Sequence, residues 1–185
     1  MNINAVILAG GLARRMNGED KGLQCFQGKP LVQWVIERLT PQVAQISINA
    51  NRNQMRYAQW GLPVFADDLP NFQGPLSGML TALQQSKSEM TLFVPCDSPV
   101  FPLNLVAKLQ QNTAKNGAFA ADFTRDHPTF CLLSKQLIPA LSTYLAQGER
   151  RLLQFMQQQQ LARVAFSSTE GEFVNFNCLA DLQAD

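Results

Sequence analysis

The sequence predicts a Rossmann-like α/β fold of three layers, in which helices cover both faces of a mostly parallel sheet. Apolar runs of strand length alternate with segments whose apolar residues recur every three or four positions, a spacing typical of amphipathic helices. Such alternation indicates crossover connections, which place helices on both faces of a sheet. The run Met90–Pro95 is apolar on both faces, so we expect it in the centre of the sheet.

Each expected element follows from its local pattern. Short apolar runs predict strands at residues 3–9, 46–50, 64–66, 90–95, 118–121, 129–133, 164–166 and 173–174. Helical spacing predicts helices over residues 30–39, 76–83, 137–145, 151–156 and 179–182, and a further helix that begins at Pro102. Pro30 and Pro102 suit the first position of a helix, because the N–H that proline lacks has no partner there. We expect a turn at residues 125–128, between two of the strands.

The composition favours one domain that spans residues 1–185. A chain of 185 residues with 46% hydrophobic residues can bury a sizeable core, and no apolar run approaches the ~20 residues of a membrane-spanning helix. The formal net charge of +1 gives no electrostatic reason to expect a nucleic acid or a membrane as a partner. The four cysteines are far apart in the sequence, which argues against a zinc site and against a disulfide framework. We expect each of them to be a small buried hydrophobic residue: Cys25, Cys96, Cys131 and Cys178. The absence of a disulfide framework favours a cytoplasmic protein.

The stretch that follows the first expected strand has the composition of a phosphate-binding loop. It contains several glycines and basic residues, among them Gly10, Gly11, Arg15 and Lys21. Glycines let backbone N–H groups approach an anion, and the basic side chains can neutralise charge on phosphoryl oxygens. The spacing fits neither the Walker loop nor the dinucleotide-binding fingerprint. The alternative is a surface turn with scattered basic residues.

Polar residues also follow the other expected strands, at the edge where open α/β sheets bind ligands. Asp97 ends an apolar strand, where a carboxylate is costly unless it has a partner. One carboxylate together with substrate phosphates is enough for a nucleotide-bound Mg²⁺, so Asp97 is either a metal ligand or the N-cap of a helix. Asn49 and Asp67 could hydrogen-bond a base or a ribose, or they could simply form turns. His127 could make a structural hydrogen bond or contact a substrate.

The motifs together resemble a known family. Residues 8–11, 15–16 and 20–22 resemble the signature of nucleotidyltransferases that use nucleoside triphosphates. The remaining motifs narrow the resemblance, in the order Gly74-Pro75-Leu76-Ser77-Gly78, Pro95-Cys96-Asp97-Ser98-Pro99, Asp126-His127-Pro128-Thr129, Gly148-Glu149-Arg150-Arg151 and Phe173-Val174-Asn175-Phe176-Asn177. In that order and spacing the chain, from Ile3 to about Leu182, is similar to the molybdenum cofactor guanylyltransferases.

The resemblance implies a nucleotidyltransferase fold and a role for each matching residue. The nucleotide would be bound by Leu8, Ala9, Gly10, Gly11, Lys21, Asn49, Asp67 and Asp97. Asp97 would also hold Mg²⁺, and the catalytic residues would be Arg15, Lys21 and Asp97. The acceptor would be bound in the second half of the chain by Arg150, Asn175 and Asn177, although Arg150 could instead begin an exposed helix.

The reaction that the resemblance implies is transfer of GMP from GTP to the terminal phosphate of molybdopterin, with release of pyrophosphate. Other proteins of cofactor biosynthesis and molybdoenzyme chaperones are candidate partners on the same ground. Three alternatives remain: a cytidylyltransferase on the same cofactor, a sugar-1-phosphate nucleotidylyltransferase, and a non-catalytic module that binds nucleotide. The preference for guanine follows from the resemblance more than from any single residue.

Overall fold

A seven-stranded sheet forms the centre of the molecule, in a computed structural model that describes residues 3–10, 20–69, 74–167 and 169–176. The strand order is β5-β4-β1-β6-β8-β7-β9. The strands are β1 (Asn4–Leu8), β4 (Gln45–Asn49), β5 (Val64–Phe65), β6 (Met90–Pro95), β7 (Gly117–Ala121), β8 (Asp126–Ser134) and β9 (Ala162–Ala165). Only β8 runs against its two neighbours, β6 and β7, so the sheet is mostly parallel as predicted. The strand β6 occupies the middle position, which confirms the expectation from its two apolar faces.

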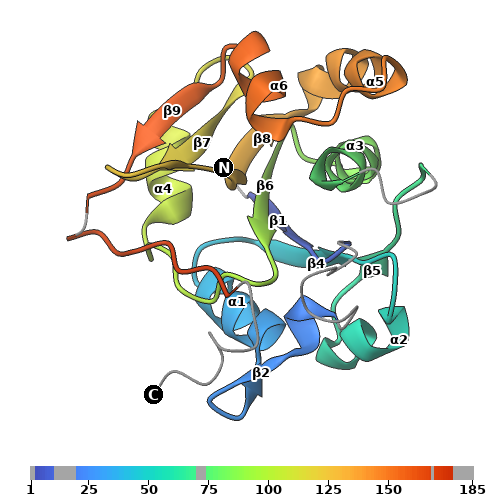
Figure 1. The fold of residues 1–185 in the computed structure, drawn as a ribbon, viewed down its shortest axis with the longest axis vertical. Coiled ribbons are helices and arrows are strands. Elements are labelled where there is room, and N and C mark those ends of the chain that lie inside the picture. The colour runs from blue at the N-terminus through green and yellow to red at the C-terminus, as the bar shows by residue number, and fades with distance from the viewer. Residues whose placement is uncertain (1–2, 11–19, 70–73, 168, 177–185) are drawn as a thin grey trace.

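Helices cover both faces of this sheet, which gives the three predicted layers (Figure 1). The helices α1 (Leu31–Leu39) and α4 (Leu105–Gln111) share one core cluster with Leu92 and Val94 of β6. The helices α3 (Pro75–Gln85), α5 (Ile138–Ala146) and α6 (Leu152–Gln158) share the other cluster with Phe93. Successive residues of a strand point to opposite faces, so this one strand contributes to both clusters.

Several short elements have no counterpart among the expected ones. A hairpin of β2 (Cys25–Phe26) and β3 (Lys29–Pro30) precedes α1, so Pro30 lies just before the helix instead of at its first position. The short helix α2 (Gln54–Tyr57) and the 3₁₀ turns η2 (Lys21–Leu23), η3 (Ala58–Trp60) and η4 (Lys135–Leu137) complete the described elements. The helix expected from Pro102 begins three residues later, as α4.

The turn expected at residues 125–128 lies elsewhere. The chain reverses at residues 122–125, where one carboxylate oxygen of Asp122 accepts from the N–H groups of Thr124 and Arg125 at 2.6 and 2.8 Å. Asp126 and His127 therefore begin β8. Pro128 fits in this strand because the register between β7 and β8 shifts there, from Phe119 opposite Cys131 to Ala120 opposite His127. Proline, which cannot donate to the ladder, is tolerated at such an irregularity.

Two other expectations are corrected or lie outside the described residues. Residues 173–174 form no strand; Val174 makes only an isolated antiparallel bridge with Val100. Cys96 and Cys131 are buried as expected, whereas Cys25 is exposed. The helix expected at residues 179–182 and Cys178 lie outside the described residues.

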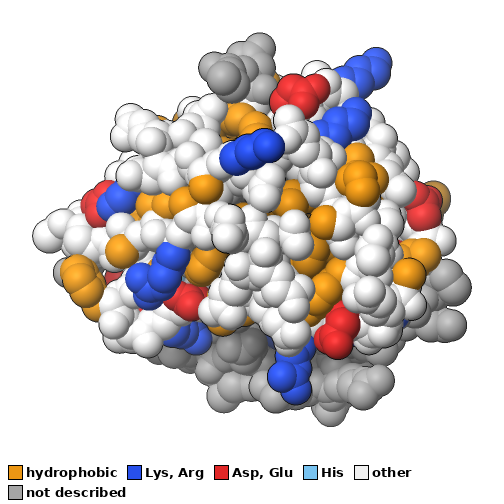
Figure 2. Space-filling view, turned by 90° about the horizontal axis from the view of Figure 1, so that it is seen from above, with side chains coloured by type: hydrophobic (Ala, Val, Ile, Leu, Met, Phe, Trp, Pro, Cys, Tyr) orange, Lys and Arg blue, Asp and Glu red, His pale blue; other side chains and the backbone are white. Residues whose placement is uncertain are grey.

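The described surface agrees with the small net charge. On the face seen in Figure 2, lysine and arginine side chains alternate with acidic and hydrophobic ones, and the described residues form no broad patch of one sign. None of the described helices is long and apolar enough to cross a membrane.

Candidate active site

The polar residues that follow the parallel strands meet at one edge of the sheet. Leu8, the last residue of β1, is paired with Asn49 at the end of β4 and with Pro95 at the end of β6. Asn49 is in turn paired with Phe65 at the end of β5. The segments that follow these strands therefore start side by side, at the carboxyl edge where α/β folds bind their ligands.

Lys21 and Asp97 form an ion pair at this edge. The Lys21 Nζ lies 3.0 Å from Oδ2 of Asp97, and the two side chains are 23% and 13% exposed. Among the described residues, the other carboxylate oxygen, Oδ1, accepts one long hydrogen bond, from the Ser98 hydroxyl at 3.4 Å. No described helix begins at Asp97, so the alternative of an N-cap is wrong; α4 begins at Leu105, after Asn104. The structure thus joins the two charged residues that the sequence singled out.

A buried hydrogen-bond network holds the backbone next to Lys21. Asp20 is only 7% exposed, and its carboxylate accepts from the Tyr57 hydroxyl and, at 3.2 Å, from Nδ2 of Asn53. Burial, followed by the nearby Cys96 and Asp20, raises the pKa of Tyr57, so its hydroxyl stays protonated as the donor. This network was not predicted from the sequence. A signal existed at Asp20, since an aspartate directly before a candidate site lysine needs partners if it is buried.

Glycine at position 22 makes room for this network. A Cβ at Gly22 would lie 2.6 Å from the Tyr57 hydroxyl oxygen, which is closer than side chains tolerate, and a tight 3.1 Å from Cβ of Cys96. The pKa of the Cys96 thiol is raised well above its ordinary value by burial, and further by the negative charge of Asp97. The buried Cys96 thiol therefore stays protonated and packs as a small apolar side chain.

Asn49 and Asp67 are brought together, but mainly with each other. Asn49 is 2% exposed and donates from Nδ2 to Oδ1 of Asp67 at 2.8 Å. Its own Oδ1 faces Gly78 at the start of α3, where a Cβ would come within 2.2 Å. Asn51 accepts from the Asp67 N–H at 2.8 Å, which fixes the backbone of that residue. Asn49 thus orients Asp67, while Asp67, which is half-buried, is the better placed of the two to meet a ligand.

The helix α3 begins at the same edge. Gly74 precedes it with a φ of +82°, a conformation that glycine adopts without strain, and Pro75 occupies the first helical turn. The Ser77 hydroxyl is fully buried, and it has no hydrogen-bond partner among the described residues. The free N–H groups of a helix N-terminus favour an anion or a polar base edge nearby.

The residues expected on the acceptor side are only partly described. Arg150 lies between α5 and α6, where Nη1 donates to the carbonyls of Leu145 at 2.9 Å and Glu149 at 2.6 Å. It therefore closes the end of α5 and does not begin α6, which starts at Leu152. Asn175 is exposed, between the buried Phe173 and Phe176. The expected residues Gly11, Arg15 and Asn177 lie outside the described residues.

The environment of His127 favours the structural alternative. His127 is 8% exposed, and its Nε2 lies 2.6 Å from Oδ2 of Asp122. Its ring stacks on Phe173 with centroids 4.4 Å apart. Hydrogen bonds from Thr124 and His127 hold the pKa of the Asp122 carboxyl well below its usual range, so Asp122 remains a charged acceptor.

The single carboxylate of Asp97 is compatible with a Mg²⁺ ion that a nucleotide brings with it. Among the described residues, no group of three or more histidine, cysteine, aspartate or glutamate side chains could hold a metal. Mg²⁺ typically takes one or two carboxylates and completes its shell with substrate phosphates and water. Asp97 offers one such carboxylate, and the Lys21 ammonium lies beside it.

Comparison with known proteins gives relatives over the whole chain. Molybdenum cofactor guanylyltransferase of Pasteurella multocida is 59% identical over 186 residues, which is 99% of this chain and 98% of the relative. The protein of the same name from Haemophilus influenzae is 57% identical, over 99% of this chain and 97% of the relative.

Solved structures share the fold at low sequence identity. Molybdopterin-guanine dinucleotide biosynthesis protein A of Archaeoglobus fulgidus superposes with a TM-score of 0.75 at 18% identity, over 98% of this chain and 95% of the other. The inositol-1-phosphate CTP transferase of T. maritima gives a TM-score of 0.78 at 12% identity, over 97% and 91% of the two chains. The profile of the MobA-like NTP transferase domain matches residues 5–164. The chain therefore belongs to the MobA-like NTP transferases and, within them, to the molybdenum cofactor guanylyltransferase family.

Proposed function

We propose that this chain transfers GMP from GTP to the terminal phosphate of molybdopterin, forming the guanine dinucleotide form of the cofactor and releasing pyrophosphate. The observation that carries the proposal is the pairing of Lys21 with Asp97, 3.0 Å apart, at the carboxyl edge of the sheet. Relatives that match the chain over nearly its full length are named for this activity, which supports the same reading.

The described residues support catalysis by positioning and charge neutralisation. Asp97 would hold Mg²⁺, and the ion, when bound, neutralises charge on phosphate oxygens. Lys21, together with Arg15, would stabilise the negative charge that develops as pyrophosphate leaves. The attacking group is already an anionic phosphate, so no general base is required. The engagement of His127 with Asp122 agrees with this, because the only histidine of the chain is otherwise occupied.

The nucleotide and the acceptor would occupy two parts of one cleft. Leu8, Ala9, Gly10 and Gly11 would line the nucleotide, and Asp67, held by Asn49, would contact the base or ribose. Arg150, Asn175 and Asn177 would contact the acceptor, whose phosphate suits a guanidinium. We further propose a cytoplasmic location, with other proteins of cofactor biosynthesis and molybdoenzyme chaperones as partners.

A pyrophosphate-release assay tests the proposal. The purified chain is supplied with GTP or CTP and Mg²⁺, with and without molybdopterin. Release that requires both GTP and molybdopterin supports it. Turnover with CTP would identify a cytidylyltransferase instead, and release with a sugar 1-phosphate in place of molybdopterin would identify a sugar enzyme. Tight GTP binding with no release under any condition would identify a non-catalytic module.

A further inference from the structure

The last described segment of the chain is tied to the loop that carries Asp97. The N–H of Phe176 donates to the Asp97 carbonyl at 2.9 Å, and the N–H of Val174 donates to the Val100 carbonyl at 3.0 Å. We call residues 171–176 the strap, because they run along the loop of residues 97–100. Asn175 lies between the two hydrogen-bonding residues and is exposed. The strap thus sets where Asn175 stands relative to Asp97.

Aromatic side chains of the strap pack against rings of neighbouring segments. The Phe173 ring stacks on His127 and packs 5.0 Å from the ring of Phe130. The Phe176 ring lies 4.6 Å from that of Phe26, in the hairpin that follows Lys21. Phe176 therefore contacts the segments of both residues of the central ion pair, one through its backbone and the other through its ring.

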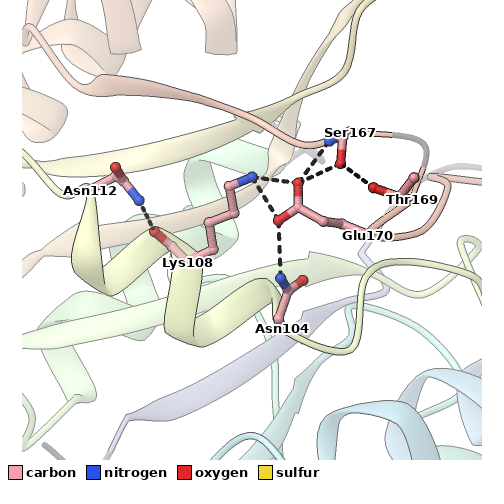
Figure 3. Close-up of polar contacts among 6 residues, drawn as sticks. All are labelled: Asn104, Lys108, Asn112, Ser167, Thr169 and Glu170. Atoms are coloured by element: carbon pink, nitrogen blue, oxygen red, sulfur yellow. Dashed lines mark hydrogen bonds and ion pairs between the residues drawn. The ribbon is translucent and has the colours of Figure 1, made fainter.

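A cluster of polar contacts fixes the point at which the strap begins. Both carboxylate oxygens of Glu170 accept from the Lys108 Nζ of α4, at 2.7 and 2.6 Å, and one also accepts from Asn104 at 3.1 Å (Figure 3). The N–H and the hydroxyl of Ser167, just after β9, both donate to Glu170 at 2.9 Å. The Lys108 ammonium also lies 4.7 Å above the Phe166 ring. We call these contacts of Glu170 the clasp.

We propose that the clasp is a positioning device for the acceptor side of the site: by fixing the start of the strap to α4, it sets the register of the strap on the Asp97 loop and the placement of Asn175. This inference rests on the proposed function, in which Asn175 contacts molybdopterin. Glu170, Lys108 and Asn104 act through the strap and touch neither substrate.

The composition of the clasp favours positioning over a contribution to stability. Glu170 and Lys108 are each 25% exposed, and ion pairs with such exposure contribute little to the free energy of unfolding. Convergence of four donor groups on one carboxylate nevertheless fixes the direction of the chain closely. Hydrogen bonds from Lys108 and Ser167 lower the pKa of Glu170 to about 2. The clasp is therefore fully formed above the ordinary pKa of 4.5 and is lost only as the pH falls towards 2, so assays near neutrality test it intact.

The test compares Glu170→Gln with the matched control Glu37→Gln. Glu37 of α1 forms a similar ion pair, at 2.7 Å, with Lys29 of β3. For each variant we would measure kcat and the KM for molybdopterin, the Kd for GTP by calorimetry, the melting temperature, and the hydrogen exchange of the Val174 and Phe176 amides. The double variant Lys108→Glu with Glu170→Lys restores an ion pair of reversed polarity.

We expect Glu170→Gln to raise the KM for molybdopterin several-fold and to speed exchange of both strap amides, with the Kd for GTP and the melting temperature close to those of Glu37→Gln. The double variant should recover part of the KM. An unchanged KM with unchanged exchange would overturn the inference, as would an equal loss of GTP affinity. The exchange readout needs no substrate, so it separates a failed clasp from a failed assignment of the reaction: faster exchange without any turnover of the wild type would refute the proposed function alone.

Discussion

Tyr57→Phe tests whether the buried network around Asp20 holds Lys21, the lysine that we propose to bind phosphate. The substitution removes only the hydroxyl that donates to Asp20, from a side chain that is fully buried. Among the described side chains, Asp20 would keep one donor, Nδ2 of Asn53 at 3.2 Å. A hydrogen bond to a charged group contributes about 1.5–3 kcal/mol, so we expect the free energy of unfolding in urea to fall by that amount.

Tyr144→Phe is the matched control for this prediction. The Tyr144 hydroxyl, on a side chain that is 5% exposed, donates to the neutral carbonyl of Arg151 at 3.0 Å, in the other core cluster. Its loss should lower the free energy of unfolding by about 0.5–1.5 kcal/mol and leave GTP kinetics unchanged. Tyr57→Phe should in addition lower kcat/KM for GTP, because Lys21 follows Asp20 directly. If the two variants are equally stable and equally active, the Asp20 network does not position Lys21.

The remaining predictions concern the ion pair, the acceptor and the base. Lys21→Ala should lower turnover by about 10²–10³-fold with little change in melting temperature; near-normal turnover would make the loop structural. Asp97→Ala should abolish activity that titrates with Mg²⁺, and an unchanged Mg²⁺ titration would place the metal ligand elsewhere. Arg150→Glu should raise the KM for molybdopterin while the calorimetric Kd for GTP stays nearly constant; the reverse pattern would refute the division of the cleft. Asp67→Asn should reduce the preference for GTP over CTP in the pyrophosphate assay, and full retention of that preference would exclude Asp67 from base recognition.

The layers of the fold were predictable because each long helix or strand buries one or both of its faces, and this burial gives its sequence a regular apolar pattern. In α1, Leu31, Val32, Val35 and Leu39 are all buried, and their spacing is the helical period that the sequence shows. The hairpin of β2 and β3 was missed, since two-residue strands are too short to show any period. The turn between β7 and β8 was predicted too late in the sequence because Pro128 suggested a chain reversal. The chain instead reverses at Asp122, whose side chain accepts hydrogen bonds within the turn, and a register shift between the strands accommodates the proline. Local signals cannot reveal such a compensation between neighbouring strands.

The sequence predicted which residues lie together in the candidate site, but it did not predict which of them hydrogen-bond or form ion pairs with one another. Strand ends in a parallel sheet share an edge, so Lys21, Asn49, Asp67 and Asp97 could be placed together from their positions alone. Their pairing depends on side-chain reach across the fold: Lys21 and Asp97 are 76 residues apart in the chain. The hydrogen bond from Tyr57 to Asp20 could not be predicted, because in the sequence this tyrosine cannot be distinguished from any other aromatic residue of the core.

The burial of Asn49 limits which side chain could recognise the base of the nucleotide. A base edge can contact a side chain only if polar atoms remain open to it, and Asn49 is 2% exposed, with its amide bound to Asp67 and its oxygen against Gly78. Asp67 has one oxygen bound to Asn49, and the rest of its half-buried carboxylate can accept from the N1–H and N2–H₂ donors of guanine. Cytosine lacks that pair of donors, and a carboxylate left unpaired in the site costs about 1–3 kcal/mol or more. The selectivity for guanine should therefore depend on Asp67 directly and on Asn49 only through the orientation that it gives to Asp67.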